Sequence, residues 1–488
     1  MGEDLTRFRA EFNSSIRIES RPERLTSEPG AVVLRDVMER LRLGEWLAER
    51  LWDPRNPKRI THPQIELLRT SVLLLAQGWR DQDDADPLRQ DGVLRLAVSE
   101  RRGVSPLAVR PRPEGEAPPR NPSQPEGLPS QPTLSRLARV LAEEPNRAVL
   151  RSALLEVASR RLRAMRDGHR QRYVTVDVDS FPIEVHGHQP GSEQNGHYHA
   201  RIYHPLVATV AEFGDLLDVQ LRPGNAHTAD GDLEFLLPLL DQVEAKLCQV
   251  ASVRIDAGFP DEQFLAALEK RGTPYVARIK NNAVLDRMVQ PHLTRPVGRP
   301  PAEPRTWTVE MTYQAKDWSR ERRVVLVIQE KPDEFLLHYF WLLTSWTPEE
   351  KDAETLLETY RQRGTAEGHL GELMSVLHPA LSSAPRPKTH YRGKKPKKRY
   401  AAGNSFYINE ALLLLNALAY NVAHTARALM EMATQEGWSL QRLRERVLRV
   451  AGRLLLHGRR ATLVLGPASA KLWTMLLAQL GRLRYTGT

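Results

Sequence analysis

The chain begins with segments in which apolar residues recur at helical spacing. The spacing is three and four residues from Gly30 to about Arg101 and again over 128–168, which predicts helices in both ranges. Residues 102–127 between them are rich in proline, glycine and charged residues and cannot form a hydrophobic core. This composition predicts a linker or a disordered insertion. The pattern therefore places helices on either side of a linker.

The apolar period then changes from helical to alternating. Three strand-like segments follow one another, with Gly214 and Asp215 as the turn between the second and third, and helices then alternate with strands. The predicted strands lie at 172–181, 202–212, 216–223, 251–259 and 274–280, and the predicted helices at 230–247 and 261–272. Three strands followed by alternating helix and strand predict a mixed α/β sheet of the ribonuclease-H type.

A second group of strand-like segments interrupts this rhythm at 286–346, which predicts an antiparallel β insertion. Helical spacing returns from Pro348, is broken by a basic loop over 385–400, and continues in apolar helices to the end of the chain. We therefore expect the last part of the fold to be helical.

The composition is that of an ordinary soluble protein, with 41% hydrophobic and 27% charged residues, and 488 residues predict roughly two to four domains. No apolar run approaches the roughly 20 residues that span a bilayer, and the first 30 residues contain no signal-peptide core. The single cysteine, Cys248, excludes a disulfide framework and a cysteine-based zinc finger. We expect an intracellular protein in a reducing compartment, with no membrane partner.

The net charge of +10 comes with arginine-rich stretches along the whole chain. Lysine and arginine neutralise phosphates and release condensed counterions, so this charge favours a nucleic-acid partner. A GC-rich genome, which raises arginine content, is the alternative explanation.

The first strand of the predicted sheet carries two aspartates where a core strand is expected. By period-two alternation, Val174, Val176 and Val178 share one face and Asp177 and Asp179 share the other. Buried carboxylates need a cationic partner or a metal ion. In a ribonuclease-H-type sheet the first and fourth strands are neighbours, so Asp179 should meet Asp256 at one edge, where the helix bearing Glu367 can pack.

Three carboxylates and a phosphate suit hard divalent cations such as Mg²⁺. Two such ions would hold the attacking and leaving oxygens of a phosphoryl transfer. Helical spacing puts Tyr360, Arg363 and Met374 on the same side of the predicted helix as Glu367. The glycines of this helix leave room for the close approach of a backbone; they are Gly364, Gly368 and Gly371.

Several motifs in this order resemble the bacterial insertion-sequence transposases with a ribonuclease-H-like DDE catalytic domain. They are DVDS, VHGHQ, YHPLVA, LRPGNAH, IDAGF and above all Y-x2-R-x3-E, together with the N-terminal SEPGAVVLRDV, AQGWRDQDDADPLRQD and SQPTLSRLA. The resemblance implies that Asp179, Asp256 and Glu367 are the catalytic, metal-binding triad, that Tyr360 and Arg363 are accessory residues, and that Asp177 is a supporting acid or ion-pair partner.

The resemblance also implies cofactors and partners. It implies two Mg²⁺ ions per active site, with Mn²⁺ as a possible substitute, double-stranded DNA at the transposon ends and target, and a homodimer in the synaptic complex. The place of action would be the bacterial cytoplasm, at the chromosome. The chain departs from the family signature at Met374, where a lysine is usual, and at Ser180 and Phe181, which follow Asp179 where a small residue and threonine are usual.

The predicted organisation follows from the pattern and the resemblance together. It comprises an N-terminal helical DNA-binding region (1–101), a linker (102–127), a helical connector (128–168), the first part of the catalytic core (169–285), the β insertion (286–346), the core helix with Glu367 (347–380), and a basic loop with C-terminal helices (381–488). In the basic loop, the residues expected to contact DNA are Arg392, Lys394, Lys395, Lys397, Lys398 and Arg399.

Other interpretations stay open at this point. Asp256 could cap the following helix, Glu367 could belong to a solvated helix face, and the basic loop could simply be solvated. The histidines His186, His188, His197, His199 and His204 could hold a zinc ion. A catalytically inactive DNA-binding remnant or repressor, and an unrelated nuclease of the same fold, are the alternatives to an active transposase.

Overall fold

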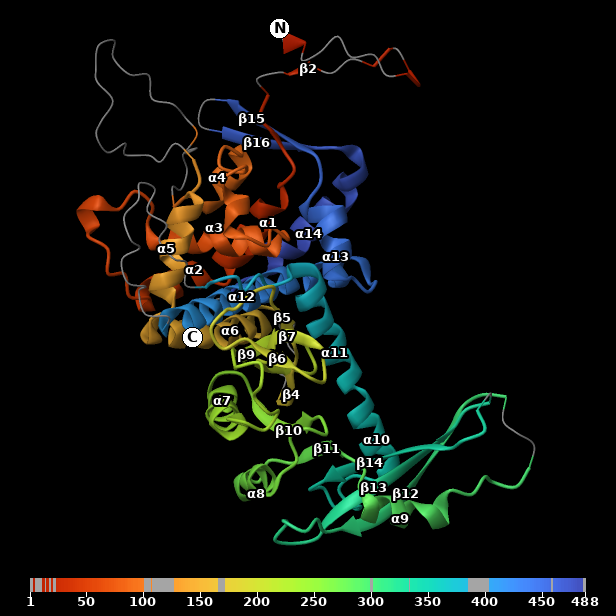
Figure 1. The fold of residues 1–488 in the computed structure, drawn as a ribbon. Coiled ribbons are helices and arrows are strands. Elements are labelled where there is room, and N and C mark those ends of the chain that lie inside the picture. The colour runs from red at the N-terminus through yellow and green to blue at the C-terminus, as the bar shows by residue number, and fades with distance from the viewer. Residues whose placement is uncertain are drawn as a thin grey trace. The chain divides into compact units, whose positions relative to one another are not determined.

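The computed structural model describes short pieces before residue 23, residue 107, and the ranges 23–100, 127–165, 172–298, 302–332, 334–384, 403–457 and 460–485. The chain divides into two compact units (Figure 1). Residues 1–48, 53–137 and 425–483 form the first unit, and residues 49–52, 138–424 and 484–488 form the second. The C-terminal segment from residue 425 therefore packs with the N-terminal helices rather than forming a region of its own.

The first unit consists mainly of helices around buried aliphatic side chains such as Leu34, Leu73 and Leu94. The last residues of α2 and α5 belong to the second unit. The elements of the first unit are β1 (Glu3–Asp4), β2 (Glu19–Ser20), β3 (Leu25–Thr26), α1 (Gly30–Arg40), α2 (Leu43–Arg50), α3 (Gln64–Ala76), α4 (Gly92–Val98), α5 (Gln131–Leu141), α13 (Leu440–Leu443), β15 (Gly452–His457), β16 (Arg460–Leu465) and α14 (Pro467–Arg482). The helices predicted from Gly30 onward are confirmed.

The expectation of a purely helical C-terminal region is wrong. Strand β15 pairs antiparallel with β16 on one side and with β3 on the other. Along β15 the side chains alternate, with Leu454 buried and Arg453 and Leu455 exposed. A period of two over six residues suits a strand, and the pairing with residues more than 400 positions earlier could not be read from the local pattern.

The second unit is built on one eight-stranded mixed sheet in the order β12-β13-β14-β11-β10-β4-β8-β9. Its strands are β4 (Tyr173–Ser180), β8 (Leu206–Val210), β9 (Leu216–Gln220), β10 (Gln249–Ile255), β11 (Tyr275–Ile279), β12 (Arg305–Tyr313), β13 (Arg322–Glu330) and β14 (His338–Thr344). Strands β4, β10 and β11 run parallel, so the first and fourth strands of the predicted core are neighbours as expected.

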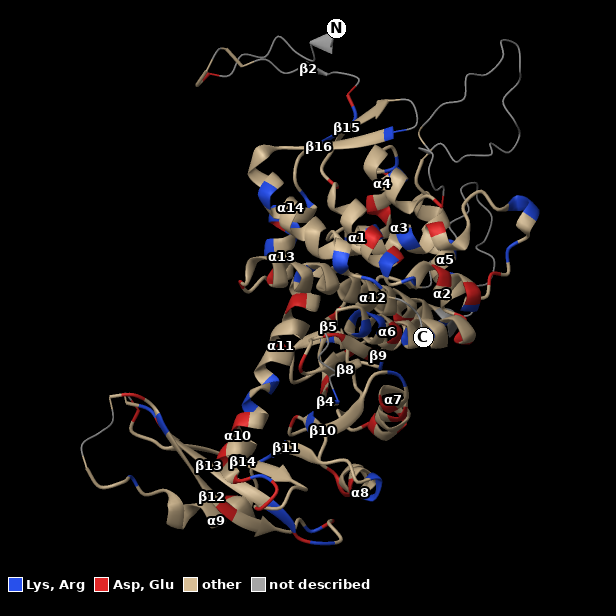
Figure 2. Ribbon diagram, turned by 180° about the vertical axis from the view of Figure 1, so that it is seen from behind, with Lys and Arg blue, Asp and Glu red and all other residues tan. Residues whose placement is uncertain are grey.

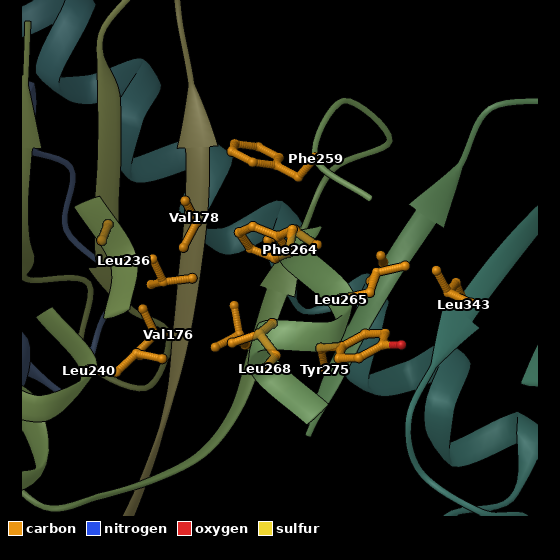
Figure 3. Packing of buried hydrophobic residues seen from close by; sticks show 14 of the residues in the cluster. Val176, Val178, Leu236, Leu240, Phe259, Phe264, Leu265, Leu268, Tyr275 and Leu343 are labelled. Atoms are coloured by element: carbon orange, nitrogen blue, oxygen red, sulfur yellow. The ribbon is translucent and has the colours of Figure 1, made fainter. Parts of the chain in front are cut away.

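Helices cover both faces of this sheet. They are α6 (Glu144–Ala164), α7 (Asp232–Lys246), α8 (Glu262–Arg271), α9 (Ala283–Val289), α10 (Ala353–Arg361), α11 (Arg363–Glu372) and α12 (Gly403–Thr434), the last of which extends into the first unit. On one face, Val176 and Val178 of β4 pack with Leu236 of α7 and with Phe264 and Leu268 of α8 (Figure 3). On the other face, Leu356 and Leu357 of α10 pack against Val276 and Leu342.

Two details differ from the sequence-based expectation. The insertion predicted as β structure over 286–346 begins inside a helix, α9, and its three strands continue the main sheet because β14 pairs antiparallel with β11. The segment predicted as one strand over 202–212 is divided at His204 and Pro205 into β7 (Ala200–Tyr203) and β8. Proline has no N–H for a ladder, which suits a break between sheets. Strand β7 lies in a small sheet between β5 (Ile183–Glu184) and β6 (Glu193–Asn195).

Candidate active site

The carboxyl ends of β4 and β10 bring two aspartates together. Ile255 of β10 is opposite Val178 of β4 in a parallel register, so Asp256, directly after β10, comes next to Asp179. Val178 and Ile255 point into the core. Because side chains alternate along a strand, the two aspartates lie on the opposite face, which α10 covers. The sheet register thus unites residues that are distant in sequence.

Asp177 lies on the same face of β4 but has a partner of its own. Its two carboxylate oxygens accept hydrogen bonds of 2.6 Å each from Nε and Nη2 of Arg254 on β10. Both side chains are at most 3% exposed. Arg254 also donates from Nη1 to the carbonyl of Thr359 in α10, at 2.8 Å. The ion pair therefore ties the sheet to the helix that leads to Glu367.

The predicted helix with Tyr360, Arg363 and Glu367 consists of two helical segments and a π-helical end. Asp352 caps α10 by accepting a hydrogen bond from the Thr355 N–H, and Gln362 separates α10 from α11. Met374 lies beyond α11 in the π-helical segment η4 (Leu373–Leu377). Figure 2 shows charged residues along both helices.

Arg363 connects two members of the predicted triad. Its Nη2 donates to Oδ2 of Asp179 at 2.6 Å, and its Nη1 donates to Oε1 of Glu367 on the next turn of α11. The Arg363 side chain is 8% exposed, whereas the Glu367 side chain is 57% exposed. One buried guanidinium thus holds the carboxylates from β4 and α11 toward each other.

The pKa values of several groups at this edge of the sheet are raised. Burial raises the pKa of Asp179 to about 6; Arg363 and the Ser180 N–H oppose that rise, while Asp256 and Glu367 add to it. Burial also raises the pKa of Tyr360. The Tyr198 phenol, between β6 and β7, has its pKa raised by burial and then by the charges of Asp179 and Asp256.

The carboxylates suit a divalent cation in their chemistry, because oxygen ligands are what Mg²⁺ and Mn²⁺ prefer. Across the described ranges, however, no three Asp, Glu, His or Cys side chains stand close enough to hold a metal ion together. Arg363 provides the positive charge between Asp179 and Glu367. Since the Glu367 side chain is mostly exposed, it can turn from Arg363 toward an ion without repacking the core.

The remaining predicted residues are placed as follows. The basic loop residues Arg392, Lys394, Lys395, Lys397, Lys398 and Arg399 lie outside the described residues, as does nearly all of the predicted linker. The five candidate zinc histidines form no metal-binding group in the described part of the chain, and His204 is hydrogen-bonded through Nδ1 to the Ala226 carbonyl at 3.0 Å.

The glycines of α11 were expected to allow a close backbone approach. A Cβ added at Gly364, Gly368 or Gly371 would meet nothing within 4 Å, so no described part of the chain approaches them. The bare backbone of α11 faces open space beside Glu367.

Sequence reasoning missed Arg254 and Tyr198. Arg254 lies in the strand predicted over 251–259, two residues before Asp256, and an arginine between apolar residues of a core strand is a usable signal for a buried acid. No comparable signal marks Tyr198, since its place depends on the fold of the β6–β7 hairpin.

Comparison with known proteins identifies the family of this chain. The family described as transposase DDE domain group 1 matches residues 8–379. No curated protein matches the chain. A solved structure, the piggyBac transposase synaptic complex with hairpin DNA, is similar over 87% of this chain and 80% of its own, with 11% identity and a TM-score of 0.41. No helix in the described part of the chain has the length and apolar content to cross a membrane. The match over 8–379 shows that the chain belongs to the DDE transposase family.

Proposed function

We propose that the chain is the transposase of a bacterial insertion sequence, acting on chromosomal DNA in the cytoplasm. It would bind terminal inverted repeats as a homodimer, cut the DNA strand at the element's end and join that end to target DNA. The observation that carries the proposal is the meeting of Asp179 and Asp256 at one sheet edge, with Glu367 joined to Asp179 through Arg363.

Asp179, Asp256 and Glu367 would hold two Mg²⁺ ions, or Mn²⁺ in their place. When bound, the ions would activate the attacking oxygen and stabilise charge on the leaving oxygen. The chain's own residues provide the rest of the site. The ion pair of Asp177 with Arg254 fixes β4, β10 and α10, which keeps both aspartates and the start of α11 in place.

Arg363 would serve the substrate as well as the carboxylates. Once Glu367 turns toward the metal site, one arm of the guanidinium is free to donate to a phosphate oxygen, a pairing that arginine geometry favours. Tyr360 and Tyr198 would border the scissile phosphate, because the charges of the site act on both phenols. The basic loop with Arg392, Lys394, Lys395, Lys397, Lys398 and Arg399 would add sequence-independent phosphate contacts.

The reaction would proceed in two displacements at phosphorus. In the first, a water oxygen bonds to phosphorus and the bond to the 3′ oxygen breaks, which frees a 3′-hydroxyl and leaves a 5′-phosphate. In the second, that 3′ oxygen attacks a target phosphodiester, displaces the target's own 3′ oxygen and loses its proton. In each step one P–O bond forms and one breaks, the attacking oxygen loses a proton and the departing 3′ oxygen gains one, and no cofactor besides the divalent ion is needed.

The test is divalent-dependent nicking of a labelled duplex that carries the element's end, alongside gel-shift binding of the same DNA. Asp179→Asn, Asp256→Asn and Glu367→Gln should each abolish nicking and keep binding, because the affinity comes from basic residues. Glu358→Gln, which removes an exposed carboxylate from α10, is the matched control and should stay active. Full activity of Glu367→Gln would overturn the assignment.

A second candidate function is a catalytically inactive DNA-binding remnant or repressor. It is favoured by the Arg363 bridge, which leaves no assembled group of metal ligands among the described residues, and by Met374 in place of lysine. The same assay separates the two functions: specific binding by the unaltered chain without any nicking in Mg²⁺ or Mn²⁺ would favour the remnant.

A further inference from the structure

Arg278 belongs to the same row of residues as the two aspartates. In the parallel pair of β10 and β11, Ile255 is opposite Ala277, so the next positions are Asp256 and Arg278. In the pair of β10 and β4 the next positions are Asp256 and Asp179. Neighbouring strands are about 4.8 Å apart, which puts the Arg278 backbone one strand from Asp256 and two strands from Asp179.

The Arg278 side chain points to the face that carries the site. Tyr275 and Ala277 of β11 pack in the same core cluster as Val178 and Ile255. Val276 packs against α10 on the other face, and alternation puts Arg278 on that face too. The row Asp179, Asp256 and Arg278 is therefore presented on one side of the sheet.

Arg278 differs from the other arginines of this sheet in having no acidic partner. Arg254 pairs with Asp177, Arg305 with Glu330, Arg322 with Glu262 and Glu269, and Arg323 with Glu310. Within the described part of the chain, no carboxylate pairs with Arg278. The Arg278 side chain is exposed. Carboxylates of the chain neutralise the other arginines of the sheet, so Arg278 is the arginine of this sheet that can bind an anion of another molecule.

An aromatic ring, that of Phe340, packs against Arg278. Its guanidinium carbon lies 5.1 Å from the centre of the Phe340 ring on β14, which leaves the N–H groups free to donate. The positive charge of Arg278 also acts on the Tyr360 phenol, as does that of Arg363. Arg278 and Arg363 thus lie on the same side of the sheet as the carboxylates, and both reach toward Tyr360.

We propose that Arg278 is a phosphate-binding residue that holds the cut DNA strand at a phosphate beside the scissile one. The inference rests on the proposed function and adds to it the position of the strand, which would run across the ends of β4, β10 and β11. A planar guanidinium backed by an aromatic ring presents paired donors to phosphate oxygens. A phosphate on Asp179 and Asp256 would have its neighbour close to Arg278.

The experiment measures binding of an end duplex by the full chain in EDTA, so that catalysis does not enter. The dissociation constant is measured against salt for the unaltered protein, Arg278→Ala, Arg278→Lys and the control Arg305→Ala, which removes a paired arginine from the same sheet. Thermal melting of each variant confirms folding. A second series replaces single phosphates around the cleavage position by uncharged methylphosphonates.

We expect Arg278→Ala to flatten the slope of log K against log salt by about 0.9, the value for one lost phosphate contact, and we expect Arg278→Lys and Arg305→Ala to keep the slope. One methylphosphonate beside the scissile position should weaken DNA binding by the unaltered protein but leave DNA binding by Arg278→Ala unchanged. An unchanged slope with unchanged methylphosphonate sensitivity in Arg278→Ala would overturn the inference. If the unaltered chain binds no DNA end at all, the proposed function fails, which is a different result.

Discussion

Asp177 and Arg254 face each other across the parallel strands β4 and β10, and both oxygens of the aspartate accept 2.6 Å hydrogen bonds from the arginine. Both side chains are almost completely buried. The third donor of Arg254 reaches the Thr359 carbonyl. We infer from this arrangement that the pair supports the candidate site and takes no direct part in the proposed reaction.

Breaking this pair should therefore cost stability. Asp177→Asn and Arg254→Gln each leave the charge of the other residue buried and uncompensated, and we expect a loss of about 3–5 kcal/mol in the free energy of unfolding. Urea denaturation measures the loss. The exposed pair of Arg42 with Glu45 is the control, and Glu45→Gln should change stability by less than about 0.5 kcal/mol. A loss below about 1 kcal/mol in both core variants would contradict the supporting role.

Arg363 should compete with divalent cations for the carboxylates of the site. In Arg363→Gln, Asp179 and Glu367 lose their shared cationic partner, so we expect tighter Mg²⁺ binding by the protein without DNA, by up to about tenfold. Isothermal titration measures the affinity, with Arg361→Gln as a control at an exposed position next to the site. Nicking should fall at the same time. Equal or weaker Mg²⁺ affinity would show that Arg363 does not oppose metal binding.

Asp232, at the start of α7, should give the protein a pH-dependent stability. Burial and, after it, the charge of Asp261 raise its pKa to about 7, and one carboxylate oxygen, Oδ2, has no hydrogen-bond partner. In the folded state the group keeps its proton up to about pH 7, whereas in the unfolded state it loses the proton near its usual pKa of 3.8. Its stabilising contribution is therefore complete below about pH 4 and is lost as the pH rises to about 7.

Asp232→Asn mimics the protonated form at every pH. The variant should match the unaltered protein near pH 4 and be more stable above pH 7, by at most about 4 kcal/mol. Urea denaturation between pH 4 and 8 measures this, and Glu234→Gln, at an exposed position in the same turn, should show no such trend. A stability difference that is independent of pH would refute the assignment.

Gly224 should be indispensable for the loop after β9. A Cβ added there would lie 2.0 Å from the Ile202 carbonyl oxygen and 2.8 Å from the Glu193 backbone nitrogen. Because backbone atoms cannot give way cheaply, Gly224→Ala should destabilise the fold by more than about 2 kcal/mol. Gly196→Ala, whose Cβ would meet nothing within 4 Å, should stay within about 0.5 kcal/mol. Equal melting temperatures for the two variants would contradict the packing of this loop.

Much of the second unit could be predicted from the sequence because its elements are locally periodic. The alternation of Val174, Val176 and Val178 sets the core face of β4, and the order of strands and helices identifies the neighbours of β4 in the sheet. Once β4 and β10 are parallel neighbours, their carboxyl ends bring Asp179 and Asp256 to the same edge of the sheet. This part of the candidate site needs only period and order.

The rest depends on register and on single side-chain contacts. The opposition of Asp256 and Arg278 requires the exact pairing of β10 with β11, and a shift of one residue would turn Arg278 into the core. The bridge by Arg363 and the pair of Asp177 with Arg254 require the position of α10 on the sheet. The pairing of β15 with β3 could not be predicted because β3 is distant in the chain, whereas the local hairpin of β15 and β16 was missed.

The continuous hydrogen-bonding from β11 into β14 has a mechanical consequence. An insertion on a separate hinge could move while the candidate site stayed still, but Val276 to Ile279 are paired one by one with Thr344 to Trp341. Any tilt of β12, β13 and β14 would have to twist β11, and with it the neighbour of Asp256. The inserted strands are therefore held at a fixed distance and angle from the candidate site by the hydrogen bonds of the sheet.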